Sequence, residues 1–381
     1  MGYPGPDPTL PARGAGPGTG QPVRLLPTRA HHTSGHDTGP PAAGTAPAAS
    51  LRTGAWDPLV DAFGRLHDDL RISVTDRCNL RCIHCMPEGV VFRPRPELLQ
   101  YEEIVRVAGV ARRLGVRSVR ITGGEPLVRR GVVDLVRRLA SLGFDDLSLT
   151  TNGTLLGPLA GPLAGAGLHR VNISCDSLRP DRFAAIRRRG DLATVLAAMD
   201  SAEAAGLGPV KVNVVLLAGI NDDEVEAFAA FARRTGRPVR FIEFMPLDAP
   251  GDWSRSQVVP SADVIERINR RWPLVAVANS DQSPAERYRF ADSQGEVGVI
   301  ASVTRPFCGT CNRLRLTADG ALRNCLFARS ERSVRDILRD GGDDEAIASA
   351  VRAAVMAKAA GHGIDEPGFL RPQRSMSMIG G

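Results

Sequence analysis

Hydrophobic and polar positions between residues 70 and 245 follow two alternating periods. Short segments with the pattern of a β-strand are separated by segments with the 3.6-residue period of an amphipathic helix. The expected strands are 70–75, 117–122, 146–151, 169–175, 210–217 and 239–245. The expected helices are 101–114, 132–142, 158–166, 181–188, 192–205 and a segment capped by Asn221–Asp223 that ends at Arg234. This alternation predicts parallel pairing in an α/β fold, either an open sheet or a complete or partial barrel.

The pattern changes on both sides of this region. Residues 1–50 contain ten prolines and nine glycines, and Tyr3 is their one aromatic residue. Such a segment cannot bury enough apolar surface to offset its ordering entropy, so we expect a disordered tail over 1–55 and a core over 65–250. Beyond Pro246 we expect a smaller α+β region over 251–381, with a helix at 261–271, strands at 287–290, 297–301 and 313–317, and helical structure at 331–360.

Composition narrows the class of protein. The 381 residues are 43% hydrophobic and carry a net charge of +6, which suits a large core and an anionic ligand such as a nucleotide. Neither a run of about 20 apolar residues nor a secretory leader is visible, so we expect a cytoplasmic protein without a membrane segment. No basic block is interleaved with aromatic residues, so nucleic acid is not indicated. Lys211 and Lys358 are the only lysines among 48 basic residues.

Six of the seven cysteines fall into two groups. Cys78, Cys82 and Cys85 have C-x3-C-x2-C spacing directly after the first expected strand. Grouped cysteines in a chain without an export signal indicate metal or redox chemistry rather than disulfides. Three thiolates can bind three irons of a 4Fe–4S cluster and leave the fourth open, and the alternative is zinc bound by Cys82, Cys85 and two distant ligands. The added cysteine at a strand end favours the cluster.

The second group contains Cys308, Cys311 and Cys325. Its spacing alone favours zinc with a fourth ligand that is not cysteine. Arg313 and Arg315 follow Cys311 at alternate positions, so both side chains face one side of a strand.

Two further features indicate ligand binding. Gly-Gly-Glu-Pro at 123–126 follows the second strand, where glycines let a ligand approach the backbone and Glu125 could receive an ammonium group; the alternative is a simple turn.

Four basic residues lie on expected strands, where a buried charge is costly unless it faces a cavity and finds a partner. An edge ion pair is the alternative for each of them: Arg71, Arg120, Lys211 and Arg240.

The first cysteine motif is the signature of the radical S-adenosylmethionine (SAM) enzymes. The segment Leu70–Cys82 (LRISVTDRCNLRC) resembles, more narrowly, the MoaA family of GTP 3′,8-cyclases of molybdenum cofactor biosynthesis. The resemblance extends from about Arg65 to Gly381. It implies a partial (βα)6 TIM-type barrel whose open side is closed by the C-terminal α+β region. It also implies two 4Fe–4S clusters, SAM as cofactor and GTP as substrate.

The reaction implied by the resemblance starts with reductive cleavage of SAM to methionine and a 5′-deoxyadenosyl radical. This radical removes hydrogen from ribose C3′ of GTP, and C3′ then bonds to C8 of guanine. The product is (8S)-3′,8-cyclo-7,8-dihydroguanosine 5′-triphosphate, the first intermediate of molybdopterin biosynthesis. An electron donor, the downstream cyclic pyranopterin monophosphate synthase and a second copy in a homodimer are the implied partners.

The resemblance assigns residues to each ligand. The six grouped cysteines are implied to bind the two clusters: Cys78, Cys82, Cys85, Cys308, Cys311 and Cys325. SAM contacts are implied for His84, Gly124, Ser174 and Met245. GTP contacts are implied for Arg71, Arg120, Thr150, Lys211, Arg240, Arg313 and Arg315. The C-terminal Gly380 and Gly381 are implied to reach into the active site and take part in catalysis.

Two positions depart from the family pattern. His84 stands where an aromatic residue such as tyrosine is usual, and Ser118 stands where a lysine is usual. The change at His84 puts the side-chain contact to SAM in question, and the change at Ser118 puts one phosphate contact in question. Two rival functions also remain: another radical SAM enzyme with an auxiliary cluster, such as a peptide maturase, and a zinc-binding interaction module. GTP-dependent turnover and metal analysis distinguish them.

Overall fold

The six expected strands pair in parallel, each beside the next in chain order. They are β1 (Asp69–Ser73), β2 (Ser118–Thr122), β3 (Asp146–Thr151), β4 (Arg170–Ser174), β5 (Lys211–Leu216) and β6 (Val239–Glu243). The computed structural model describes residues 56–247, 253–278, 283–292 and 295–380. The tail expected over 1–55 and the terminal Gly381 lie outside these residues.

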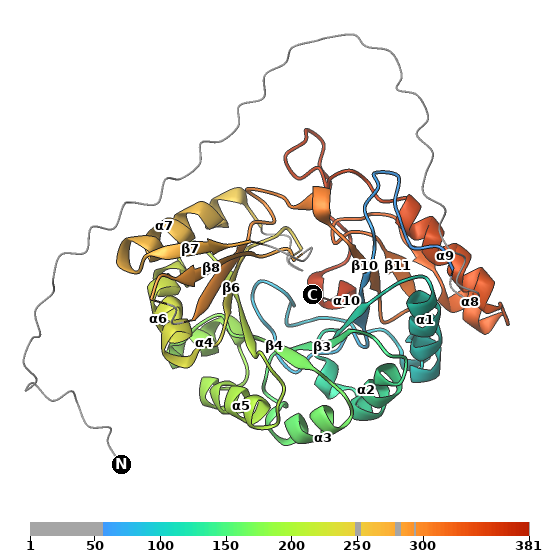
Figure 1. Ribbon diagram of the computed structural model, residues 1–381, viewed down its shortest axis with the longest axis horizontal. Helices are drawn as coiled ribbons and strands as arrows, with labels where there is room; N and C mark the ends of the chain where they lie inside the picture. Colours follow the sequence, from blue (N-terminus) through green and yellow to red (C-terminus); the bar gives the residue numbers. More distant parts are fainter. Residues whose placement is uncertain (1–55, 248–252, 279–282, 293–294, 381) are drawn as a thin grey trace, which may run out of the picture. The chain divides into compact units, whose positions relative to one another are not determined.

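The connecting helices lie on the outer side of the strands (Figure 1). They are α1 (Tyr101–Arg113), α2 (Val132–Ala140), α3 (Ala160–Gly165), α4 (Pro180–Arg187), α5 (Leu192–Ala204) and α6 (Val225–Thr235). Short 3-10 helices occur at η1 (Arg95–Glu97), η2 (Pro126–Val128), η3 (Gly157–Leu159), η4 (Asp222–Glu224), η5 (Arg255–Gln257) and η6 (Cys308–Thr310). The apolar faces of strands and helices share one large buried core, as the periodicity predicts.

The strands after Pro246 continue the same sheet, which among the described residues has the order β12-β11-β10-β1-β2-β3-β4-β5-β6-β9-β8-β7. β10 (Arg313–Leu316) pairs in parallel with β1, and β9 (Glu296–Ile300) pairs in parallel with β6. The outer strands β7 (Leu274–Val277), β8 (Glu286–Phe290), β11 (Ala321–Arg323) and β12 (Arg332–Ser333) are antiparallel. The sheet is therefore curved and open, which confirms the partial barrel.

The remaining helices differ in part from the expectation. α7 (Ser261–Arg271) has the expected bounds, whereas the expected helical stretch 331–360 contains β12, α8 (Arg335–Arg339) and α9 (Asp344–Met356). α10 (Met376–Ile379) ends inside the ring of strands in Figure 1. A second, smaller apolar cluster holds this end of the chain, with Leu247, Val303 and Ile379 among its buried members.

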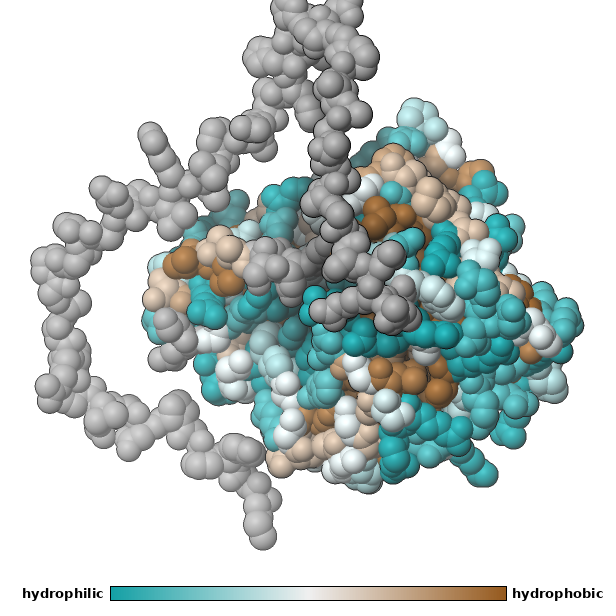
Figure 2. Space-filling model, turned by 45° about the vertical axis from the view of Figure 1, so that its right-hand side comes forward, coloured by the Kyte–Doolittle hydropathy of each residue, from teal (hydrophilic) through white to brown (hydrophobic). Residues whose placement is uncertain are grey.

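The outer surface carries dispersed apolar residues. Figure 2 shows one face on which hydrophilic residues predominate and hydrophobic areas are small. Within the described residues, no helix combines the length and the apolar character that a membrane-spanning segment needs.

Candidate active site

The concave side of the sheet encloses a cavity whose empty space, including its mouth, is about 1680 Å³. Side chains from β1 to β6 and from β10 line it, together with the loop after β1 and residues of α10. Most of the predicted site residues meet here: Arg71, Cys78, Cys82, His84, Cys85, Arg120, Gly124, Thr150, Ser174, Lys211, Arg240, Met245, Arg313 and Arg315. Ser118 does not line the cavity; its hydroxyl lies 3.4 Å from the carbonyl oxygen of Asp68.

The loop after β1 holds the first thiol group against the end of α4. The backbone amides of Arg81 and Ile83 donate to the carbonyl oxygens of Arg187 and Ile186, at 3.2 and 3.1 Å. All three thiols are free, and burial raises the pKa of Cys78 to about 11 and raises that of Cys82 and Cys85 as well. Such thiols ionise only when a cation binds them.

Three free thiols at one mouth of a cavity are the donor set of a 4Fe–4S cluster with one open iron. Within the described residues, no three His, Cys, Asp or Glu side chains converge closely enough to hold a single metal ion. The first thiol group, with three free thiols lining the cavity, fits the cluster that its motif predicts.

A buried ion pair lies beside this group. Arg187 Nη2 is 2.9 Å from Asp176 Oδ2, and His84 Nε2 is 3.7 Å from the same oxygen. Burial lowers the pKa of His84, and Arg187 adds to this effect against Asp176, so the ring that lines the cavity is neutral. A neutral imidazole can stack or hydrogen-bond where the family usually has another aromatic ring.

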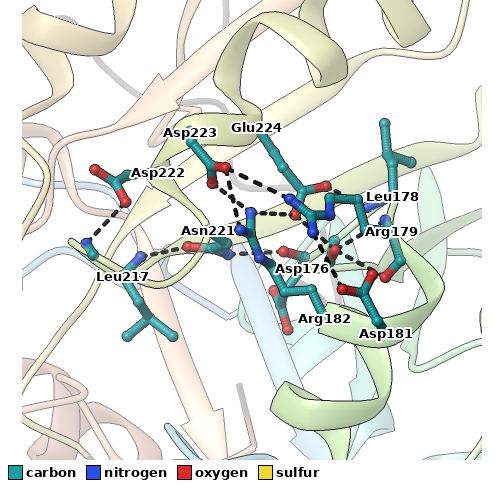
Figure 3. Close-up of polar contacts among 12 residues, drawn as sticks. Asp176, Leu178, Arg179, Asp181, Arg182, Leu217, Asn221, Asp222, Asp223 and Glu224 are labelled. Atoms are coloured by element: carbon teal, nitrogen blue, oxygen red, sulfur yellow. Dashed lines mark hydrogen bonds and ion pairs between the residues drawn. The ribbon is translucent and has the colours of Figure 1, made fainter.

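Asp176 is fixed by the loop after β5, as Figure 3 shows. Its backbone oxygen accepts a 2.8 Å hydrogen bond from Asn221 Nδ2, and its Oδ1 accepts one of 3.0 Å from the amide of Val215. Glu224 holds the next residues by accepting 2.7 Å bonds from Ser177 Oγ and from the amide of Leu178. The end of β4, with Ser174, is thereby locked to β5.

The Gly-Gly-Glu-Pro loop packs backbone against backbone on the loop that precedes the first thiol group. A Cβ atom on Gly124 would stand 2.5 Å from the carbonyl oxygen of Arg77 and 2.7 Å from that of Asp76. Glycine is therefore required here by close approach.

Glu125 lines the cavity, as expected of a ligand site, and protein donors also hold it. Its buried carboxylate accepts hydrogen bonds from Leu127 N (3.0 Å), Thr151 Oγ1 (2.8 Å) and Asn152 N (2.7 Å). Burial outweighs these donors and raises its pKa to about 7. Its contacts tie the loop to β3, and the loop's glycine backbone lines the cavity.

Arginines on adjacent strands form a row across the cavity wall. Arg71 pairs in register with Arg315 of β10 on one side and with Arg120 of β2 on the other. Burial lowers the pKa values of Arg71, Arg120 and Arg315. The neighbouring guanidinium groups lower the pKa of Arg71 further. Within the described residues, Arg71 Nε and Arg313 Nε and Nη2 are buried without a hydrogen-bond partner. Buried like charges with open donors are a site for a polyanion.

Lys211 and Arg240 extend this positive wall. Burial, with Arg170 and Arg240 nearby, lowers the pKa of Lys211 to about 8. Arg240 lines the cavity but also forms an ion pair with Glu296. The sequence left an edge ion pair and a position facing a cavity as alternatives for Arg240. The structure shows both.

The second thiol group lies at the other end of the same strands. Cys308 and Cys311 immediately precede β10, whereas Cys78 follows β1, and these two strands run parallel. Since a strand rises about 3.3 Å per residue, β1 alone separates the two groups by roughly 13 Å. The arginine row lies between them. Three free thiols again fit a cluster with one open iron.

The C-terminal end of the chain enters the cavity. Gly380 has φ +83°, and a Cβ atom on it would stand 2.5 Å from Thr122 Oγ1 and 2.9 Å from Ser73 Cβ. Its carbonyl oxygen accepts a hydrogen bond from Arg315 Nη1. Gly380 thus fits between the ends of β1 and β2 because it has no side chain.

Comparisons with known proteins agree with this geometry. The Radical SAM superfamily matches residues 72–232, and the Molybdenum Cofactor Synthesis C family matches residues 238–364. The GTP 3′,8-cyclase of Streptomyces coelicolor is 48% identical, over 85% of this chain and 96% of its own. That of Rhodopirellula baltica is 46% identical, over 88% and 97%. The chain belongs to the GTP 3′,8-cyclase family.

The fold of this GTP 3′,8-cyclase family member also resembles solved radical SAM enzymes. The crystal structure of Streptococcus suis SuiB bound to S-adenosylmethionine matches with a TM-score of 0.55 and 14% identity, over 75% of this chain and 68% of that one. At this identity the likeness concerns the fold alone.

Sequence reasoning missed several residues of this family member's site. Arg187 is hidden in a run of three arginines at the end of α4, so nothing in the pattern marks it. Arg65 binds the carbonyl oxygen of Cys308 at 2.8 Å, which joins segments far apart in the sequence. Lys358 contacts Cys311 Sγ at 3.2 Å, and the rarity of lysine in this chain was a signal that could have found it.

Replacing Gly124 with alanine is expected to abolish SAM-dependent formation of 5′-deoxyadenosine. The new methyl group overlaps two carbonyl oxygens, so the loop must move away from the first thiol group. Overpacking of this kind costs roughly 1–3 kcal/mol and displaces the cavity wall. Gly161→Ala in α3 is the matched control, because its Cβ would meet nothing within 4 Å. Equal activity of both variants would contradict the assignment.

Proposed function

We propose that this chain is a radical SAM GTP 3′,8-cyclase that converts GTP to (8S)-3′,8-cyclo-7,8-dihydroguanosine 5′-triphosphate in the first step of molybdenum cofactor biosynthesis. The observation that carries the proposal is a row of buried arginines in a cavity that the first thiol group lines, with the second thiol group at the other end of the β1–β10 pair. Membership of the family supports it.

The first thiol group would hold the cluster that, when bound, supplies the electron for cleaving SAM to methionine and a 5′-deoxyadenosyl radical. SAM is bound beside it by the backbone of Gly124, by Ser174 and Met245 at the ends of β4 and β6, and by His84. The walls exclude water from the radical, because these side chains are buried or half-buried on the inner face of the sheet.

The arginine row orients GTP. Arg71, Arg120 and Lys211 neutralise the triphosphate, and Thr150 and Arg240 lie on the same wall. Arg313 and Arg315 place the guanine toward the second thiol group, which would hold the second cluster. Held in this way, ribose C3′ and guanine C8 of one GTP lie close enough to bond after hydrogen is removed.

Partners follow from the chemistry of product and cofactors. A one-electron donor must reduce the first cluster, and the cyclised nucleotide is the substrate of cyclic pyranopterin monophosphate synthase. We propose a homodimer located in the cytoplasm, with a catalytic core over 65–250 and a C-terminal region over 251–381 that carries the second cluster. Of the tail over 1–55, we propose that residues 1–50 are dispensable.

The direct test is anaerobic reconstitution with iron and sulfide, followed by incubation with SAM, dithionite and GTP. We expect about eight irons per chain and a cyclised nucleotide that mass spectrometry detects only when GTP is present. A peptide maturase would bind the same iron and cleave SAM without forming this nucleotide. A zinc-binding module would contain zinc and neither activity.

Replacing Arg71 with methionine is expected to weaken GTP binding about tenfold to a hundredfold, as loss of a charge-assisted contact implies. The melting temperature of the ligand-free protein should stay level or rise, because a buried like charge is removed from the row. Isothermal titration calorimetry and thermal unfolding measure the two effects. Arg289→Met, on the exposed side of β8, is the control. A large loss of stability with unchanged GTP affinity would assign Arg71 a structural role instead.

A further inference from the structure

The segment that follows α9 closes around the second thiol group. Lys358 is 6% exposed, and its Nζ lies 3.2 Å from Cys311 Sγ and 3.0 Å from the carbonyl oxygen of Arg313. Cys311 therefore receives an N–H donor from the segment that directly follows α9.

Arg65 fixes this segment in place. Its guanidinium group donates to the carbonyl oxygens of Ala359 (2.7 Å) and Ala360 (3.0 Å) and also to that of Cys308 (2.8 Å). Asp61 holds Arg65 through a buried ion pair of 2.6 Å. The ammonium group of Lys358 is thus carried on a braced backbone and not on a free loop end.

The residue type is informative. Of 48 basic residues, 46 are arginine, yet a lysine occupies this position. An ammonium group is compact and directs donors to several acceptors at once, whereas a planar guanidinium group needs more room and a forked acceptor. The space between Cys311 Sγ and the Arg313 carbonyl suits the former.

We propose that Lys358 is a positioning residue for the second cluster, whose N–H···S bond to the Cys311 thiolate and positive charge set how readily that cluster is reduced. The inference rests on the proposed function in one respect, that the second thiol group holds a cluster. Hydrogen bonds to the sulfurs and nearby charge are established determinants of cluster reduction potential. A positive group stabilises the reduced, more negative cluster and therefore raises its potential.

The first experiment compares reconstituted wild type with Lys358→Met, which has a similar length without charge or donor. Redox titration followed by electron paramagnetic resonance should show the second cluster shifted to a lower potential and the first cluster unchanged, so the first serves as an internal reference. Arg352→Met on α9, which removes a half-exposed charge, should shift neither cluster. A fully loaded Lys358→Met protein with an unshifted second cluster overturns the inference. A wild type that binds only four irons overturns the proposed function instead.

A second experiment leaves Lys358 unchanged, so it tests the contact between Lys358 and the second cluster even if the Lys358→Met protein does not load its clusters. The chain has two lysines, so growth on lysine labelled with 15N at Nζ marks two side chains, and Lys211→Arg leaves Lys358 alone labelled. The Cys82→Ala change in the same chain is expected to remove the first cluster's signal. Pulsed electron paramagnetic resonance of the reduced second cluster should then detect hyperfine coupling to 15N. Absence of this coupling overturns the inference.

Discussion

Replacing Cys82 with alanine is expected to abolish SAM cleavage, whereas replacing Cys311 with alanine should leave some cleavage but no cyclised nucleotide. The two thiol groups lie at opposite ends of the β1–β10 pair and share no ligand, so losing one cluster need not disturb the other. Cys82 belongs to the group that would hold the cluster whose open iron binds SAM, and Cys311 belongs to the group proposed to face guanine.

The measurement is 5′-deoxyadenosine and cyclised nucleotide in parallel, with iron content of each variant. We expect about four irons in both variants and at least a thousandfold loss of product in both, because each removes an interaction that the reaction cannot replace. Cys175→Ala is the control, since Cys175 is buried in the apolar core and belongs to neither thiol group. Loss of 5′-deoxyadenosine in Cys311→Ala with the first cluster intact would refute the division of labour.

Removal of Gly380 and Gly381 is expected to reduce product formation at least a hundredfold while both clusters and GTP binding persist. Gly380 packs against Ser73 and Thr122 at the ends of β1 and β2, and its carbonyl oxygen accepts a hydrogen bond from Arg315, which lines the cavity. Its loss removes this contact and releases a guanidinium group of the arginine row. Ile379, which is buried, still anchors the truncated end, so folding should be unaffected.

Product per 5′-deoxyadenosine formed is the decisive measurement, because a disordered site wastes radicals without stopping SAM cleavage. Gly380→Ala should show the same uncoupling, since its methyl group meets Thr122 Oγ1 at 2.5 Å. Gly165→Ala, whose methyl group meets nothing within 4 Å, is the control. Full coupling in the truncated enzyme would leave Gly380 without a catalytic role.

The sequence predicted the six parallel strands because each buries a local apolar pattern that periodicity reveals. It could not predict that β10 and β9 extend the six-stranded parallel sheet beside β1 and β6, with two further strands outside each of them. Their pairing with β1 and β6 depends on contacts between distant segments: Asn312 and Asp68, 244 residues apart, share a 2.7 Å hydrogen bond. The short strands expected at 297–301 and 313–317 were therefore found, while their place in the sheet was not.

The candidate site divides in the same way. Residues that carry a motif could be identified from the sequence: the first cysteine group and Gly124 line the cavity, and the second cysteine group lies at the other end of the β1–β10 pair. Arg187 and Arg65 could not, because an arginine in an arginine-rich chain carries no signal until its partner is known. The three hydrogen bonds to Glu125 likewise come from η2, from the last residue of β3 and from the residue after it, and no local pattern shows these partners.

The pairing of β10 with β1 has a consequence for biogenesis. A ribosome synthesises β1 early, yet the strand that covers its edge emerges only after Leu316. During that interval the nascent chain presents an unpaired, apolar strand edge, which is prone to intermolecular pairing. The arginine row also lacks Arg315 until then, so a nascent or truncated chain cannot use nucleotide binding to stabilise its fold. Polypeptides that stop before β10 should therefore depend on chaperones and accumulate as aggregates.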